Sequence, residues 1–291
     1  MQSFFNFNPI VVAIYFLAVC GISMFCMNPF LLLLSLIGAF VYFITINKNG
    51  NSSHGFYLLL FAVMALINPM VSHNGVTVLF VFNDSPITME AIIYGITASA
   101  MIIAVLYWFR SFTLIMTSDK LLYIFGKLSP RLALILSMAI RYVPLFTRQA
   151  KKINQSQTAL GLYREDNVID RIKGRTRVFS ILITWALEGG IITADSMTAR
   201  GYGNTKRSHF SIFKFQRSDL YLLLSVTLLS ALTCISISQG AMSFIFYPAI
   251  EISEFSALSL AGYISYGILV LLPTILEAEE KIKWKYLISR I

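Results

Sequence analysis

Six long stretches of apolar, almost uncharged residues constrain this chain more than any other feature of its sequence. They lie at about residues 10–27, 30–46, 56–72, 88–109, 219–238 and 257–276. A helix needs about 20 apolar residues to cross the hydrocarbon core of a bilayer, so each stretch is long enough, or nearly so, to span it. The third stretch is the weakest, because Asn68-Pro69 interrupts it near its end. We therefore predict an all-α, polytopic membrane protein with about six transmembrane helices, surrounded by the lipid bilayer.

The overall composition supports this fold class. Of 291 residues, 57% are hydrophobic and 13% are charged, whereas soluble domains carry about 25% charged residues. The net charge of +9 would raise nucleic acid as a partner of a soluble protein, but basic residues also collect on the cytoplasmic side of membrane proteins. The three cysteines lie in apolar runs and lack the spacing of metal ligands. We predict no metal site, no cofactor and no nucleic-acid partner.

Loop charge orients the predicted spans. Residues 73–90 and 239–257 contain no Lys or Arg, while basic residues such as Lys48, Arg110 and Lys281 lie at the opposite ends of the spans. Because Lys and Arg are enriched in cytoplasmic loops, we predict that both chain termini are cytoplasmic. An even number of spans agrees with this orientation.

Two further helical patterns lie between the fourth and fifth stretches, at about 131–161 and 176–200. Residues 141–217 hold 14 of the 23 basic residues and only five acidic ones. In the first pattern Arg141, Arg148 and Lys152 share one helix face. In the second a polar stripe that includes Glu188 follows a mostly apolar helix. The Gly189-Gly190 pair is compatible with a hinge and equally with close packing against another helix.

Both patterns could be ordinary spans, which would give eight crossings. That arrangement would place a short, strongly basic loop outside and would bury Arg141 and Glu188 in the membrane, at about 2.5–3.5 kcal/mol each. We therefore predict long amphipathic helices on the cytoplasmic side, with a shorter helical piece at 119–127. Such helices suit a membrane surface or a protein partner, and their combined length favours the partner.

The same region resembles a known family, the transmembrane T component of energy-coupling factor (ECF) transporters, which are bacterial importers of vitamins and metal ions. The second pattern ends in DSMTARGYG (195–203), which is similar to the family's Ala-Arg-Gly motif with a trailing tyrosine. SMAIRYVP (137–144) resembles its serine–arginine–aromatic–proline signature, and FNDSPIT (82–88) with Glu90-Ala91 resembles a loop and helix start. The resemblance covers most of residues 5–240 and implies two cytoplasmic coupling helices.

The resemblance also implies partners and site residues. Ala199, Arg200 and Gly201 would dock on one of two ABC-type ATPase subunits, with Gly201 allowing a left-handed helix end, and Ala159, Leu160 and Gly161 would dock on the other. The family commonly has arginine where this chain has Leu160, and Arg164, one turn later, is the candidate substitute. A substrate-binding membrane subunit, the S component, would lie on the coupling helices. Arg141, Pro144, Glu188, Gly189 and Gly190 would have structural roles.

The implied protein is a scaffold of the bacterial plasma membrane and not an enzyme. The chain contains no G-x-x-x-x-G-K-[ST] pattern for binding ATP phosphates, so hydrolysis would occur on separate subunits. A stand-alone secondary transporter or channel is the alternative, although the spans hold almost no charge and no repeat. We expect three regions: N-terminal spans (1–117), the coupling region (118–217), and C-terminal spans with a basic tail (218–291), of which 257–276 is additional to the family's usual five spans.

Overall fold

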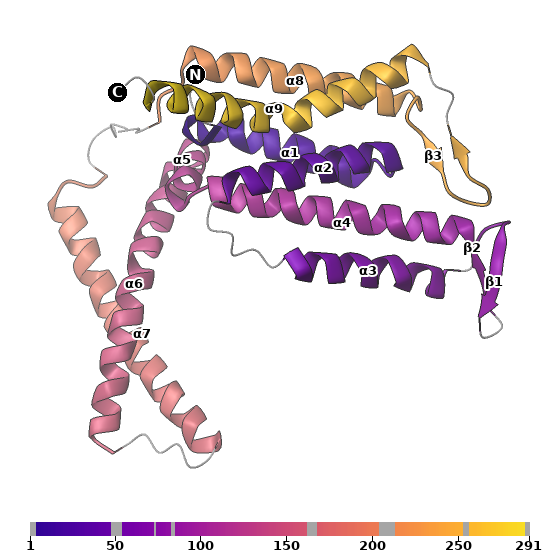
Figure 1. Cartoon of the computed structure of the whole chain (residues 1–291). Helices are drawn as coiled ribbons and strands as arrows, with labels where there is room; N and C mark the ends of the chain where they lie inside the picture. Colours follow the sequence, from indigo (N-terminus) through magenta and orange to yellow (C-terminus); the bar gives the residue numbers. More distant parts are fainter. Residues whose placement is uncertain are drawn as a thin grey trace. The chain divides into compact units, whose positions relative to one another are not determined.

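A computed structural model describes residues 4–47, 54–72, 74–82, 85–161, 168–203, 213–252 and 256–288, which are predominantly helical (Figure 1). The helices are η1, a short 3-10 helix (Phe4–Asn6), α1 (Pro9–Phe25), α2 (Pro29–Ile46), α3 (His54–Val71), α4 (Met89–Ile115), α5 (Ser118–Leu128), α6 (Pro130–Ala159), α7 (Val168–Ala199), α8 (Arg217–Ser238) and α9 (Ala257–Ile288). Two short antiparallel hairpins are also present: β1 (Val78–Phe82) with β2 (Ser85–Thr88), and β3 (Phe244–Ile245) with β4 (Glu251–Ile252).

The chain divides into two compact units. The first unit comprises residues 1–121 and 213–291, and therefore holds α1–α4, α8, α9 and both hairpins. The second unit comprises residues 122–212, with most of α5 and all of α6 and α7. Because the second unit is inserted between α4 and α8, two connections join it to the first unit.

Asn-Pro pairs begin the first two spans. Asn8 and Asn28 each accept a backbone N–H bond at the start of their helix, from Ile10 at 3.1 Å and from Phe30 at 3.0 Å. The proline that follows each asparagine lacks the N–H that would otherwise have no partner in the first turn. These caps fix where α1 and α2 begin, which allows a sharp turn between them.

Neighbouring helices of the first unit bury a core of aromatic and aliphatic side chains. Helix α2 lies against α4 and α9, α3 lies against α4, and α8 lies against α9. Tyr15, Tyr42, Trp108 and Tyr266 are completely buried. Lipid offers no hydrophobic driving force between helices, so close packing of this kind and hydrogen bonds must hold the spans together.

Small and hydroxyl-bearing residues provide those hydrogen bonds and close contacts. The Ser23 hydroxyl lies 3.0 Å from that of Ser35 and 2.9 Å from that of Tyr266. The Trp108 indole N–H donates to Ser35 at 3.1 Å. Gly38 lies directly against Val270, with no room for a Cβ atom. This network joins α1, α2, α4 and α9 in the centre of the first unit.

The predicted spans are all helices, and several differ in length from the prediction. Helix α7 begins at residue 168, eight residues before the predicted start, and therefore includes a basic segment that lacks the apolar pattern. Helix α9 runs through Pro273 to Ile288, well past the apolar stretch. The hairpins were not predicted, although Val, Phe and Thr are enriched at residues 77–88, which favours strands.

Length and composition alone do not separate the spans from the amphipathic helices. Within the described residues, seven helices are long and apolar enough to cross a membrane (α2, α3, α4, α6, α7, α8 and α9), and α1 is a shorter apolar helix. Helices α6 and α7 are the least apolar of the seven, and no residue of their apolar windows is buried. Their position on the cytoplasmic side therefore stays a prediction.

Candidate functional site

Helices α6 and α7 form an antiparallel helical hairpin. Near the middle of α6, the Tyr142 hydroxyl lies 3.0 Å from the Thr193 hydroxyl of α7. The rings of Phe146 and Trp185 meet edge to face at 5.9 Å between centroids. Farther along, Arg177 donates to the side chain of Gln157 at 3.4 Å. The helices cross in Figure 1, and these contacts fix the crossing.

The Ala199-Arg200-Gly201 motif ends α7 in a Schellman motif. The Gly201 N–H donates to the Thr198 carbonyl at 2.9 Å, and the Tyr202 N–H donates to the Met197 carbonyl at 3.0 Å. Gly201 has φ +79°, a left-handed conformation that is costly for residues with a Cβ atom. The predicted left-handed helix end is confirmed. Arg200, at the cap, is exposed.

The Ala159-Leu160-Gly161 motif ends α6 with similar geometry. The Gly161 N–H donates to the Thr158 carbonyl at 3.0 Å, and Gly161 has φ +68°. The Leu160 side chain is 70% exposed, although a leucine normally gains free energy from burial. Arg164, the candidate substitute for an arginine at 160, lies outside the described residues.

The two motifs lie at opposite ends of the α6–α7 hairpin. Arg177 contacts Gln157, which lies two residues before the end of α6. From Arg177 to the end of α7 at Ala199 is 22 residues, or about 33 Å at 1.5 Å per residue. The two motifs are therefore well separated along the hairpin.

The other predicted residues of α6 and α7 are accessible. Arg141, Pro144 and Glu188 are exposed, and α6 continues as a helix through Pro144. The Arg141 guanidinium lies 5.7 Å from the ring centroid of Tyr142. A Cβ atom at either glycine of the Gly189–Gly190 pair would have no neighbour within 4 Å. Among the described residues the pair therefore makes no close helix packing, and α7 passes through it without a break.

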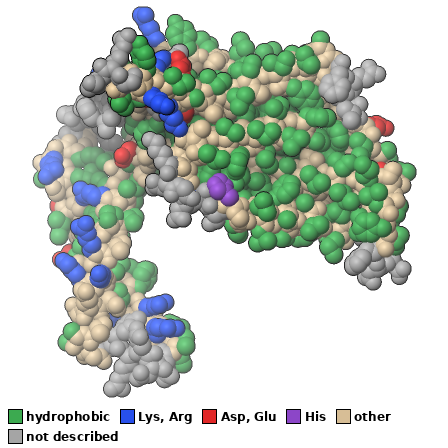
Figure 2. All heavy atoms as spheres, viewed as in Figure 1, with side chains coloured by type: hydrophobic (Ala, Val, Ile, Leu, Met, Phe, Trp, Pro, Cys, Tyr) green, Lys and Arg blue, Asp and Glu red, His purple; other side chains and the backbone are tan. Residues whose placement is uncertain are grey.

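Apolar and basic side chains are both exposed on the second unit. Figure 2 shows Lys and Arg side chains along it, whereas hydrophobic side chains cover the visible face of the first unit. Exposed apolar side chains lie on α6 (Leu132, Ile135, Val143) and on α7 (Phe179, Leu187, Ile191). Monomeric soluble proteins rarely expose so many large apolar residues together, so either lipid or a partner protein covers these faces.

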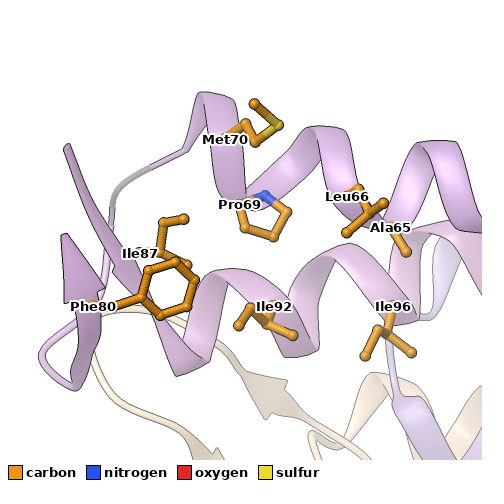
Figure 3. A pocket seen from close by; sticks show the side chains of 8 residues that line it. All are labelled: Ala65, Leu66, Pro69, Met70, Phe80, Ile87, Ile92 and Ile96. Atoms are coloured by element: carbon orange, nitrogen blue, oxygen red, sulfur yellow. The ribbon is translucent and has the colours of Figure 1, made fainter. Parts of the chain in front are cut away.

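The first unit contains an apolar cavity of about 440 Å³. Figure 3 shows its lining, which comes from α3, α4 and the β1–β2 hairpin: Ala65, Leu66, Pro69, Met70, Phe80, Ile87, Ile92 and Ile96. A typical ligand site adds a few converging polar groups to an apolar wall, and this lining has none. The described residues also contain no group of three His, Cys, Asp or Glu side chains suited to a metal.

Sequence reasoning identified the helix ends but missed the contacts that position the helices. No sequence pattern predicts that Tyr142 contacts Thr193 or that Phe146 contacts Trp185. The register of two antiparallel helices depends on the connection between them, and periodicity within each helix does not give it. Tyr142 was noticed only as part of the arginine–aromatic signature. The apolar face of each helix was the signal that some partner helix exists.

Comparison with known proteins agrees with the resemblance. Residues 2–212 match the family model CbiQ, described as cobalt transport protein. The "Energy-coupling factor transporter transmembrane protein EcfT" of Listeria innocua is 33% identical over 103 residues, which cover 35% of this chain and 39% of that relative. EcfT 1 of Listeria monocytogenes is 26% identical over 187 residues, covering 60% and 69%. EcfT of Lacticaseibacillus paracasei is 32% identical over 90 residues, covering 30% and 34%.

Proposed function

The chain belongs to the CbiQ family of cobalt transport proteins, whose members are membrane components of transporters, and we propose that it is the coupling scaffold of an ATP-driven ECF-type importer. In this role it would join two cytoplasmic ATPase subunits to a substrate-binding membrane subunit, the S component. The single observation that carries the proposal is the pair of exposed, glycine-terminated helix ends on α6 and α7.

The helix ends support docking on ATPase subunits. Arg200 is exposed beside a rigid left-handed turn, so its guanidinium can form a bidentate, charge-assisted contact with a carboxylate of a partner. Leu160 cannot make such a contact and instead offers an apolar side chain. Two ends about 33 Å apart along α7 suit two separate subunits. We propose that Ala199–Gly201 and Ala159–Gly161 are the two docking points, with Arg164 as the candidate cation of the second.

The apolar faces of α6 and α7 support a second partner. The exposed side chains of these faces, such as Leu132 and Leu187, would have unfavourable contact with water. A membrane subunit with an apolar surface would cover them, and the S component is the proposed occupant. When ATP closes the two ATPases, the helix ends would move relative to each other, and the S component would move with the helices.

The orientation is part of the proposal. The β1–β2 and β3–β4 hairpins lie at the same end of the first unit (Figure 1), and their connections carry no Lys or Arg. Lys281, by contrast, lies beyond the apolar part of α9 and donates to the Thr45 carbonyl at the end of α2. Positive charge favours the cytoplasmic side. We therefore propose an external hairpin end and cytoplasmic termini, with the second unit in the cytoplasm.

The substitution Arg200→Glu tests the docking role. It replaces a cation by an anion, which would repel an acidic groove, and we expect loss of ATPase co-purification with unchanged membrane insertion. Arg148→Glu is the matched control, because Arg148 is also an exposed arginine and lies in the middle of α6, away from both helix ends. Wild-type co-purification of both ATPases with Arg200→Glu would refute the assigned role.

A further inference from the structure

Among the described residues, each of the two connections between the units has one buried charged side chain. Lys120 lies in the first turn of α5, where the chain leaves the first unit, and Asp219 lies in the first turn of α8, where the chain returns. Their exposed fractions are 2% and 1%. Burying a charge is costly unless hydrogen bonds compensate for the lost water, so the partners of these two residues are informative.

Lys120 makes two hydrogen bonds and one cation–π contact within the first unit. Its Nζ atom donates to the Phe5 carbonyl at 2.6 Å and to the Ile115 carbonyl at 3.0 Å. It also lies 3.6 Å from the centroid of the Phe5 ring, which is a close cation–π contact. An ammonium group has three donors and no acceptor, and two of those donors are used by carbonyl groups of η1 and of the end of α4.

No carboxylate of the described residues forms an ion pair with Lys120. Burial accordingly lowers the pKa of its ammonium group to about 8. A lysine that only capped α4 would need one contact, the Ile115 carbonyl, because that group belongs to the last turn of the helix. The carbonyl and the ring of Phe5 are additional and belong to a different segment of the chain.

Asp219 divides its two carboxylate oxygens between two segments. One oxygen accepts the Gln216 N–H at 2.8 Å, which caps α8. The other accepts the Asn8 N–H at 2.9 Å, across 211 positions of the sequence. Hydrogen bonds to an ionised acceptor are about twice as strong as neutral ones. Asp219 therefore fastens the start of α8 to the residue that caps α1.

The segment Phe4–Asn8 connects these two contacts and is itself anchored in the core. Phe4 is completely buried. Its ring contacts those of Tyr15 and Tyr42 edge to face, with centroids 5.3 and 6.0 Å away. One five-residue segment thus reaches the core of the first unit, the start of α5 and the start of α8.

We propose that Phe4–Asn8 is an N-terminal clamp that fixes both connections of the second unit to the first unit, with Lys120 and Asp219 as its positioning residues. Hinge motions are absorbed at a few residues where elements end, and the clamp stiffens two such places. Motion of α6 and α7 then reaches the membrane helices and is not lost at the connections. This inference rests on the proposed function, since it concerns how ATP-driven motion is transmitted.

The experiment measures motion between the units without requiring a known substrate. Cys20, Cys26 and Cys234 are replaced by serine, and spin labels are attached at Ser196 on α7 and Ile282 on α9, both exposed. Distance distributions are recorded by pulsed electron paramagnetic resonance on the complex with both ATPases and the S component, in nanodiscs, with and without Mg-ATP. The wild-type background should give a narrow distribution that shifts with Mg-ATP.

Lys120→Met removes the ammonium group but keeps an apolar chain of similar length. We expect unchanged ATPase capture and hydrolysis, a broader distance distribution, and a shift with Mg-ATP that is at least halved. Lys281→Met is the matched control, because Lys281 also donates to a backbone carbonyl, that of Thr45 at 2.8 Å, but contacts neither connection. It should behave as the wild type.

A second pair of variants separates positioning from folding. Phe5 is 43% exposed, so Phe5→Ala should fold normally while it removes the ring beside Lys120. It should broaden the distribution, and Phe5→Tyr should restore the wild-type result because tyrosine keeps a cation–π surface. Wild-type distributions in both Lys120→Met and Phe5→Ala would overturn the clamp. Failure of the proposed function would instead appear in the wild-type chain, as absence of ATPase capture.

Discussion

Replacing Gly201 by alanine should weaken ATPase docking through backbone strain alone. Gly201 has φ +79°, and a Cβ atom there would meet no atom of the described residues within 4 Å, so no steric clash with them contributes. The left-handed conformation costs an L-residue about 1–2 kcal/mol relative to the right-handed one. The Schellman turn that holds Arg200 in place would therefore be less populated.

The magnitude follows from that population. If only the left-handed end docks, the apparent dissociation constant rises in inverse proportion to the population of that end. A cost of about 1–2 kcal/mol corresponds to an increase of about 5- to 30-fold in Kd. The assay is binding of the two purified ATPase subunits to the chain in nanodiscs, with Kd measured by biolayer interferometry.

Gly240→Ala supplies a matched control at the end of α8. Gly240 has φ +71°, and its N–H and that of Ala241 make the same pair of Schellman hydrogen bonds, at 3.0 and 3.2 Å. In the described part of the chain, no atom lies within 4 Å of a Cβ atom there either. The local cost should be equal while the Kd for the ATPases stays unchanged. A wild-type Kd for Gly201→Ala, or an equal loss in both variants, would refute the reasoning.

Two further predictions concern stability. Gly38→Ala forces a Cβ atom into Val270 and should destabilise the fold by about 1–3 kcal/mol through overpacking. Thermal unfolding in detergent should show a lower Tm, and the second substitution Val270→Ala should partly restore it. An unchanged Tm for Gly38→Ala would contradict this close contact. Burial lowers the pKa of Lys120 to about 8 from 10.5. Between these two pH values the unfolded chain binds more protons than the folded chain. The contribution of Lys120 to the free energy of unfolding therefore rises with pH in this range. The free energy of unfolding is measured against pH for the wild type and for Lys120→Met, and the difference between the two curves should show this rise. Identical curves from pH 8 to 10 would contradict it.

The spans were predictable because their signal is local and strong. Long uncharged runs gave six of the helices, and pairs such as Asn28-Pro29 marked where a helix starts. The start of a helix was less predictable where its first turns are rich in charged residues. The first turns of α7, which include Arg171 and Arg175, have no apolar periodicity, yet arginine is a good helix former, and the helix begins there.

The helix ends of the candidate site were predictable and their surroundings were not. Glycine after the last helical residue is a strong stop signal, so Gly161 and Gly201 marked both ends. The contacts of Lys120 with Phe5 and of Asp219 with Asn8 span 115 and 211 positions. Long-range pairing of single polar groups leaves no periodic pattern in a sequence, so only the folded chain shows it.

Isolation of the intact chain from native membranes tests the central claim most directly. The chain is purified in mild detergent, the mass of the complex is measured by native mass spectrometry, and its subunits are identified. A coupling scaffold should be recovered with two ATP-hydrolysing subunits and one small membrane subunit per chain, and Arg200→Glu should lose the ATPases. Recovery of the chain by itself, together with ATP-independent solute flux in liposomes that contain nothing else, would contradict the scaffold and favour a stand-alone transporter or channel.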